Sequence, residues 1–374
     1  MSEIDSVRLS NWSTCEDVIR SYIVRRICAC YSLINISGGD VNQQMTPRER
    51  VMTALSLGRP DRVPWVEAYV HPTLANQILG RTVTPAPGVR VVYELHEKLC
   101  LDNISYDFHA PLYAEIDQRG DLMLVRAPWL KTWEDLDKLQ KWLPDNSVDS
   151  FYEGAKEYLK HKGDYAAICC LKIGVANTYN SMGYEDFIYK LTDEPEFIVA
   201  CFEVWGEWCA RVIERINNMD FDIAFVAEDI AFQQGPMVVP AQYEKYIFPF
   251  CKKMFAKIAK PSIYHSDGNY TALFDYILQY GVKGLANLEP PCTDIFKVKQ
   301  TYGKKACLVG NIDLHHTLTR GTPEETITEV KEKLERVGEG GGYIIASANG
   351  LTSYCKPENV MAMNDAILKY GFLG

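Results

Sequence analysis

The sequence has no excess of positive charge and no apolar run long enough to span a membrane. Lysine and arginine number 39 against 49 acidic residues, which gives a net charge of -10. Nucleic acids and anionic lipid surfaces attract basic proteins, so we expect neither kind of partner. The start of the chain also lacks the layout of a signal peptide, and we therefore expect a cytoplasmic protein.

Cysteine is plentiful, but its spacing is irregular. The twelve cysteines form no repeated pattern, and Cys28-x-Cys30 stands alone. Cys169 and Cys170 lie in an apolar run, where buried, unreactive thiols are expected. This usage predicts reduced thiols and gives no thiolate metal motif.

Glycine-rich phosphate loops are also absent, because neither G-x-G-x-x-G nor G-x-x-x-x-G-K-[ST] follows the first β-rich run. What is present is an alternation of short β-rich runs with amphipathic helical stretches. Eight such units predict an α/β fold of the (β/α)8 TIM-barrel class, with a doubly wound open sheet as the runner-up. The eight expected strands are Arg62–Tyr69, Asn103–Phe108, Tyr165–Ile173, Phe221–Glu228, Ser262–His265, Val282–Leu288, Ala306–Ile312 and Gly342–Ser347.

The domain organisation predicted from this pattern is one barrel over residues 45–374, preceded by an N-terminal helical extension over residues 1–44. The regular pattern starts at Thr46, which can cap a helix with Pro47 at its first position and Glu49 three residues later. A hairpin is expected over Gln118–Val125. Helices are expected over Val148–Lys160, Pro195–Asn217, Pro240–Ala259, Tyr270–Tyr280 and Pro323–Val337.

In a barrel, functional residues gather at the carboxyl ends of the strands. Asp229, Glu244 and His265 form the best candidate group there, because two carboxylates and one imidazole suit a catalytic Zn²⁺ with an open fourth position. Glu228 is the alternative to Asp229, since neighbouring residues of a strand face opposite ways. For each of these residues, an ordinary structural role is the competing interpretation.

Candidate substrate-binding residues come from the same strand ends. They are Tyr69, Tyr264, Asp267, Asn311 and Asn349. Aromatic side chains near a barrel opening would suit a flat aromatic substrate, although most tyrosines of a barrel serve in packing.

Several short motifs in order resemble the uroporphyrinogen-decarboxylase superfamily. The opening stretches are Pro47-Arg48-Glu49-Arg50-Val51 and Gly58-Arg59-Pro60-Asp61-Arg62-Val63-Pro64-Trp65, and the later ones are His265-Ser266-Asp267-Gly268-Asn269, Gly310-Asn311-Ile312-Asp313 and Gly341-Gly342-Tyr343-Ile344. The resemblance covers residues 45–374 and implies a (β/α)8 barrel, in agreement with the strand pattern.

Departures from the superfamily's motifs point to one branch. The decarboxylases carry Arg-Gln-Ala-Gly-Arg after the first strand, where this chain reads Val66-Glu67-Ala68-Tyr69-Val70. The thiol-methylating branch binds zinc through His-x-Cys and a later Cys, where this chain has Asp267 and the run Ala346-Ser347-Ala348-Asn349. The cobalamin-dependent O-demethylase methyltransferases (methyltransferase I) use two glutamates and a histidine, and Asp229, Glu244 and His265 match that spacing.

The resemblance implies a zinc-dependent methyltransferase that moves the methyl group of a phenyl methyl ether to cob(I)alamin. No Asp-x-His-x-x-Gly cobalamin motif occurs, so the cobalamin is expected on a separate corrinoid protein. A methylcobamide:thiol or methylcobamide:tetrahydrofolate methyltransferase is the second interpretation. A uroporphyrinogen-type decarboxylase and a barrel that only binds ligands rank below it.

Overall fold

The computed structural model describes residues 44–374, except 120, 121 and 374. The expected N-terminal helical extension therefore lies outside the described residues, apart from Gln44. Within the described part, no helix has the length and apolar character needed to cross a membrane.

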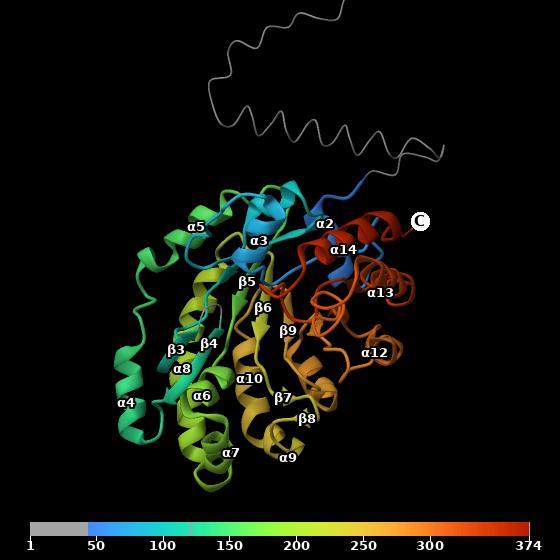
Figure 1. Cartoon of the computed structure of the whole chain (residues 1–374). Helices are drawn as coiled ribbons and strands as arrows, with labels where there is room; N and C mark the ends of the chain where they lie inside the picture. The colour runs from blue at the N-terminus through green and yellow to red at the C-terminus, as the bar shows by residue number, and fades with distance from the viewer. Residues whose placement is uncertain (1–43, 120–121, 374) are drawn as a thin grey trace, which may run out of the picture. The chain divides into compact units, whose positions relative to one another are not determined.

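Helices and strands alternate along most of the described chain (Figure 1). The strands are β1 Val89–Val91, β2 Asn103–Asp107, β3 Ala114–Arg119, β4 Leu122–Pro128, β5 Ala166–Leu171, β6 Ile223–Ala227, β7 Ala231–Phe232, β8 Gly235–Pro236, β9 Ser262–His265, β10 Gly284–Asn287, β11 Cys307–Gly310 and β12 Tyr343–Ile344. The α-helices are α2 Pro47–Leu55, α3 Pro72–Leu79, α4 Trp133–Trp142, α5 Glu153–Leu159, α6 Val175–Met182, α7 Tyr184–Asp193, α8 Pro195–Asn217, α9 Pro240–Gln242, α10 Phe248–Phe255, α11 Phe274–Ile277, α12 Ile295–Tyr302, α13 Pro323–Arg336 and α14 Pro357–Tyr370. Short helical turns of other types are η1 Tyr93–Glu97, η2 Asp149–Tyr152, η3 Tyr243–Ile247, η4 Thr271–Leu273 and η5 Leu278–Tyr280.

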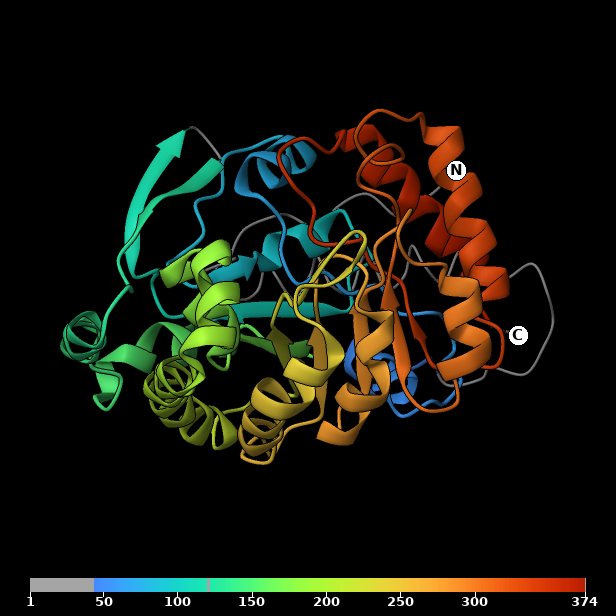
Figure 2. The same ribbon diagram turned by 90° about the horizontal axis from the view of Figure 1, so that it is seen from below.

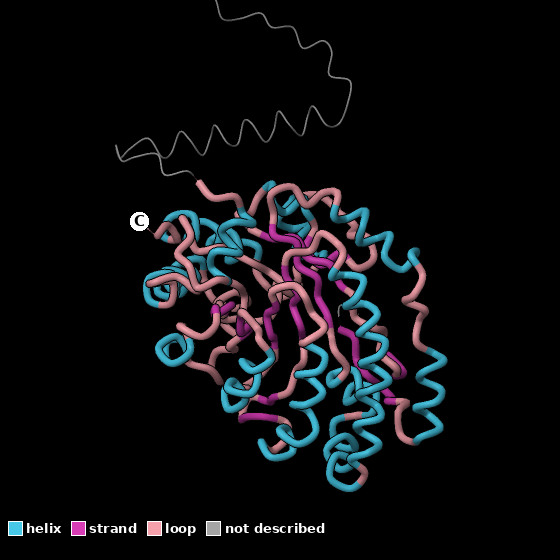
Figure 3. The backbone as a smooth tube through the Cα atoms, turned by 180° about the vertical axis from the view of Figure 1, so that it is seen from behind, coloured by secondary structure: helices cyan, strands magenta, loops and turns pink. Residues whose placement is uncertain are grey.

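The main sheet has the strand order β1-β2-β5-β6-β9-β10-β11-β12. Its strands pair in parallel, except that β1 runs antiparallel to β2. The sheet is closed by Trp65, which forms parallel bridges with Leu101 just before β2 and with Ile345 just after β12. Helices surround these strands (Figure 3). The predicted (β/α)8 class is confirmed.

Seven of the eight predicted strands appear among the described residues, most of them shorter than expected; the first one does not. Arg62–Tyr69 forms only isolated bridges, at Arg62 and Trp65. Pro64 explains part of this, because proline has no N–H to donate to a ladder. Its carbonyl still accepts a bond from the Ile345 amide at 2.9 Å, so the segment keeps the position of a barrel strand.

Three predicted helices are divided. The stretch predicted over Val148–Lys160 consists of the helical turn η2 and α5. The stretch predicted over Pro240–Ala259 consists of α9, the π-helical turn η3 and α10. Pro249 lies at the start of α10 and cannot donate the bond that would continue a regular helix, which accounts for the extra residue in the turn before it. The stretch predicted over Tyr270–Tyr280 is divided into η4, α11 and η5.

The other predicted elements are present. Thr46 caps α2 in a capping box with Glu49, and α8 spans the predicted residues. The hairpin is formed by β3 and β4, and it is longer than predicted.

The barrel interior is filled by side chains that alternate along the strands with those facing the outer helices. Helix α2 contributes Val51, Ala54 and Leu55 to this interior cluster. The strands and the segments that continue the barrel wall contribute Val66, Ala166, Ile168, Cys170, Ile223, Phe225, Ile263, Ala286, Cys307, Val309, Ile344 and Ala346. Helix α2 therefore closes the amino end of the barrel, and the carboxyl end, called here the rim, is the end available for function. In Figure 1 the helices α6 and α7 and the strands β7 and β8 lie on the side away from α2, and Figure 2 shows the molecule from that side.

A buried ion cluster lies beside α2. The Asp102 carboxylate accepts bonds from Arg50 Nη1 at 2.6 Å, from Arg62 Nη2 at 2.9 Å and from the Trp65 amide at 2.8 Å. Arg50 also bonds both oxygens of Asp61. Asp102 thereby joins the segment around Trp65 to the start of β2.

Glu67 joins the segment around Trp65 to the residues that follow β12. Its carboxylate accepts bonds from Trp65 Nε1 at 2.8 Å, from the Ser347 amide at 2.8 Å and from Ser347 Oγ at 2.6 Å. Burial raises the pKa of Glu67 to about 7, and these hydrogen bonds lower it only in part.

We predict that Glu67→Gln makes the protein more stable than the wild type at pH 8, but not at pH 5. The folded pKa of Glu67 lies above the unfolded value of 4.5, so its ionisation costs folding free energy as the pH rises from about 4.5 towards 8. Each pKa unit is worth about 1.4 kcal/mol. A glutamine amide still accepts from Trp65 and the Ser347 amide and donates to Ser347 Oγ.

Urea unfolding at both pH values measures this difference. Parallel stability curves for Glu67→Gln and the wild type between pH 5 and pH 8 would contradict the prediction.

Candidate metal centre

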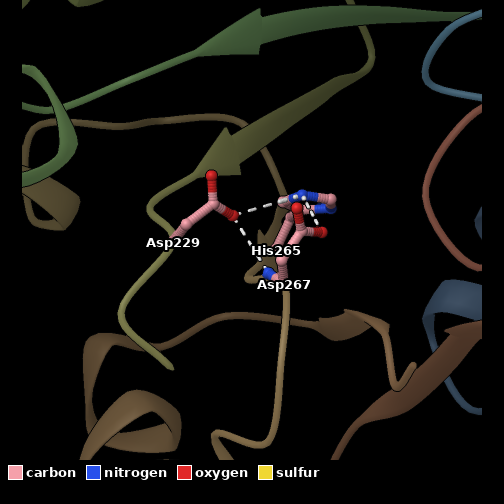
Figure 4. A group of neighbouring side chains, drawn as sticks. All are labelled: Asp229, His265 and Asp267. Carbon is pink, nitrogen blue, oxygen red and sulfur yellow. Dashed lines mark hydrogen bonds and ion pairs between the residues drawn. The ribbon is translucent and has the colours of Figure 1, made fainter. Parts of the chain in front are cut away.

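Asp229, His265 and Asp267 come together at the rim (Figure 4). One ligand atom from each residue lies within 4.8 Å of the other two. His265 Nε2 is 3.5 Å from Asp229 Oδ1 and 3.6 Å from Asp267 Oδ1. The Asp267 amide also donates to Asp229 Oδ1 at 3.0 Å, which ties the two loops together.

Two neighbouring strands position these side chains. His265 is the last residue of β9, and Asp229 lies two residues beyond the end of β6. The imidazole packs against Phe225, one of the interior residues, with 5.2 Å between ring centroids. The cluster therefore lies directly above the apolar interior of the barrel.

The structure decides between Glu228 and Asp229. Glu228 points away from His265 and accepts backbone N–H bonds from Ile173 at 2.5 Å, Gly174 at 3.2 Å and Ala176 at 2.6 Å, at the start of α6. Burial raises the pKa of Glu228 to about 7, although these bonds favour the charged form. Glu228 anchors α6 to β6, and Asp229 is the residue that faces the cluster.

Amide groups hold Asp267 in place. Asn287 Nδ2 donates to Asp267 Oδ1 at 2.5 Å, and Asn349 Nδ2 lies 3.0 and 3.1 Å from the two carboxylate oxygens. Burial raises the pKa of Asp267 to about 7, and the nearby charges of Asp229 and Glu289 add to the increase. Asp267 and Asn349, both predicted to bind substrate, thus form hydrogen bonds with each other.

His265 is buried, and this burial lowers its pKa. Its Nδ1 atom is buried and has no hydrogen-bond partner among the described residues. The Nε2 atom is the one that faces the two carboxylates.

Glu244 does not join the cluster, contrary to the predicted ligand set. It lies exposed in η3, where its carboxylate accepts a bond from the Tyr276 hydroxyl at 3.1 Å. Its neighbour Tyr243 is fully buried, so the inner face of the turn is already occupied. The structure brings Asp267 to His265 in place of Glu244.

Tyr264 is also placed differently from the prediction. It precedes His265 in β9 and therefore faces the outer helices, where it stacks on Phe255 with 6.0 Å between ring centroids. Its hydroxyl donates to the Glu228 carbonyl at 3.1 Å. Tyr264 is a core residue and not part of a substrate site.

The remaining predicted residues have distinct surroundings. Tyr69 is half-buried beneath the guanidinium group of Arg90, whose central carbon is 5.0 Å from the ring centroid. Asn311 is buried, and its amide donates to the Leu288 carbonyl at 2.5 Å. Lys333 Nζ donates to the Asn311 carbonyl at 2.5 Å, so Asn311 joins the strand end to α13.

The sequence interpretation did not identify Asn287, although it ends a predicted strand as the other candidates do. Glu289, two residues beyond Asn287, was not among the candidates either. Glu289 accepts the Gly268 amide at 2.9 Å and lies 3.1 Å from His315 Nε2, so it borders the cluster. The signal that could have found both residues is their position at the end of β10, next to β9.

The donor set fits a divalent metal ion. Two carboxylates and one imidazole are hard or borderline ligands, which suit zinc with an open position. The two carboxylates repel each other, as the raised pKa of Asp267 reflects, and a cation between them would offset that repulsion.

Comparisons with known proteins agree with this fold. The family model described as uroporphyrinogen decarboxylase (URO-D) matches residues 120–370. The methylcobamide:CoM methyltransferase of Methanosarcina acetivorans is 23% identical over 360 residues, which cover 88% of this chain and 99% of that protein. A uroporphyrinogen decarboxylase of Methylococcus capsulatus is 37% identical, but over only 78 residues, 21% of this chain and 22% of that protein.

Among solved structures, a methyltransferase from Methanosarcina mazei superposes with a TM-score of 0.70 at 18% identity, covering 87% of this chain and 99% of that one. This likeness shows a shared fold over the whole barrel. Because the family model spans more than half of the sequence, the chain belongs to the uroporphyrinogen decarboxylase (URO-D) family.

Proposed function

We propose that this protein is a methyltransferase that moves the methyl group of a phenyl methyl ether to the cob(I)alamin of a separate corrinoid protein. A zinc ion held by Asp229, His265 and Asp267 would assist the transfer. The observation that carries the proposal is the convergence of these three side chains at the rim of a barrel whose full-length relatives include a corrinoid-dependent methyltransferase.

The chemistry of the ligands favours an ether over a thiol as the substrate. Thiolate ligands make zinc softer, whereas carboxylates leave it more Lewis-acidic towards oxygen. The metal would make a phenolate a better leaving group, which matters because a phenol has a pKa of about 10. The transfer breaks the methyl–oxygen bond, forms a methyl–cobalt bond and releases the phenol after protonation.

The chain's own residues would orient the ligands of the centre. Asn287 and Asn349 fix the Asp267 carboxylate through their amide groups, and Asp229 is fixed by the Asp267 backbone amide. Such outer contacts determine the direction in which the ligand oxygens point.

Aromatic side chains near the cluster support a flat substrate. Tyr179 stacks on Tyr184 at 4.8 Å, and Tyr184 contacts Phe232 at 6.0 Å between ring centroids. The Tyr179 hydroxyl is buried without a hydrogen-bond partner among the described residues. Burial raises its pKa, and the negative charges of Asp229 and Asp267 raise it further. These rings would exclude water from one side of the reacting group.

A second candidate function is methyl transfer from methylcobamide to a thiol. The relative that matches 88% of the chain carries that kind of name, and this observation favours it. Against it, no thiol belongs to the cluster in the described part of the chain. The assay below therefore tests both reactions.

We predict that the purified protein binds about one zinc ion per chain. Zinc should be lost in His265→Ala and in Asp267→Asn, because each change removes one ligand. Glu244→Gln is the control and should keep its zinc, since Glu244 lies exposed beside Tyr276. Metal analysis after dialysis measures all four proteins. Loss of zinc in Glu244→Gln together with its retention in Asp267→Asn would restore the ligand set predicted from the sequence.

We further predict formation of methylcobalamin when the protein, cob(I)alamin and 4-methoxyphenol are incubated without oxygen. Asn349→Ala should lower the rate by about 10- to 100-fold, because it frees the Asp267 carboxylate without removing a ligand. Absorbance of the corrinoid and chromatography of the released phenol follow the reaction. Activity only with methylcobalamin and a thiol would reject the ether and establish the second candidate.

A further inference from the structure

Side chains of both charges lie at the rim. Carboxylates of the metal centre follow β6 and β9, whereas two cations, Arg90 and Lys172, belong to β1 and to the end of β5. In a protein of net charge -10, a pair of cations facing the interior of the barrel calls for a physical reason.

Arg90 is held in a fixed orientation. Its Nε donates to the Ala68 carbonyl at 3.1 Å, and its Nη1 lies 3.3 Å from Asp107 Oδ2. The guanidinium group lies over the ring of Tyr69. These three contacts fix the plane of the guanidinium, and about a quarter of the side chain (26%) stays exposed.

Lys172 faces the interior side of the rim. Cys170, two residues earlier, belongs to the interior cluster, whereas Leu171 and Ile173 belong to the outer one, so the alternation directs Lys172 inward. The residue is half-buried, and its ammonium group forms no hydrogen bond or ion pair with another described residue. A half-buried ammonium without a partner is available to a ligand.

The register of the strands places both cations beside the metal centre. Leu171 of β5 lies opposite Val226 of β6, so Lys172 lies beside Ala227, two residues before Asp229. Arg90 contacts Asp107, which lies opposite Cys170, two residues before Lys172. The two cations therefore follow Asp229 around the rim.

Resting on the proposed function, we propose that Arg90 and Lys172 form a subsite for a carboxylate group of the substrate, whose ether oxygen would lie at the metal centre. The substrate class is then an aromatic methyl ether that carries a carboxylate. Arg90 is paired with Asp107, so Lys172 is the cation whose charge a substrate carboxylate would neutralise. Arg90 would supply the planar donor pair and Lys172 the point charge.

Binding of two matched probes tests the subsite. Calorimetric titration of the purified full chain should show that 4-methoxybenzoate binds about tenfold or more tightly than the neutral 4-methoxybenzamide, because a charge-assisted bond contributes only to the anion. Lys172→Met should abolish this preference, and Lys172→Arg should keep most of it. Lys305→Met removes an equal charge from an exposed side chain before β11, and it should leave both affinities unchanged.

Equal affinity for the two probes would overturn the subsite, as would a preference that survives both Lys172→Met and Arg90→Met. Thermal melting of each variant separates lost folding from lost binding. The titration needs no corrinoid, so its result is independent of methyl transfer. If a Lys172-dependent preference for the benzoate were found without methyl transfer, the subsite would stand and the proposed reaction would fall. Transfer from neutral ethers without any charge preference would support the proposed reaction and overturn the subsite.

Discussion

The barrel depends on the way in which its first segment is held between the last strand and the second. The residues around Trp65 form too few ladder bonds to act as a strand by themselves, and the buried Asp102 carboxylate makes up the difference by accepting the Trp65 amide and two arginines. Burying such charges is costly, and removing one partner would leave an uncompensated carboxylate in the core. With the segment in place, the strands keep their circular order, and the ends of β6 and β9 lie side by side. The candidate metal centre at one end thus depends on an ion cluster at the other.

This arrangement explains why the opening motif marks the fold and not the chemistry. Arg50, Asp61 and Arg62 all belong to the buried ion network, and none of them lies at the rim. The motif would be needed in any barrel closed in this way, whatever reaction it performs. Asp267, where the chain departs from the motif of the thiol-methylating branch, lies at the opposite end beside His265.

The fold could be predicted from the sequence because seven strands show as apolar runs of the right length, each followed by a helix or a loop. The sequence analysis predicted a full first strand over Arg62–Tyr69. The hydrophobic pattern of this segment does not reveal that isolated bridges and an ion cluster hold it in place of a regular ladder of backbone hydrogen bonds. At the candidate site, Asp229 and His265 come together as expected, because one follows β6 by two residues and the other ends β9. Glu244 was not placed correctly, because a position on a helix does not specify which side of the turn faces the barrel. Tyr264 and His265 are adjacent in one strand, and only one of them could face inward. The contacts of Asn287 depend on the register between β9 and β10, which the sequence alone does not define.

Helix α2 fills the amino end of the barrel with Val51, Ala54 and Leu55, and this has a kinetic consequence. Because the amino end of the barrel is closed, every reactant must approach from the rim. A small molecule bound above Phe225 would be trapped by any protein that then covers the rim, and that protein would exclude the small molecule if it arrived first. If a partner protein covers this rim during the reaction, the small reactant would have to bind before the partner and leave after it.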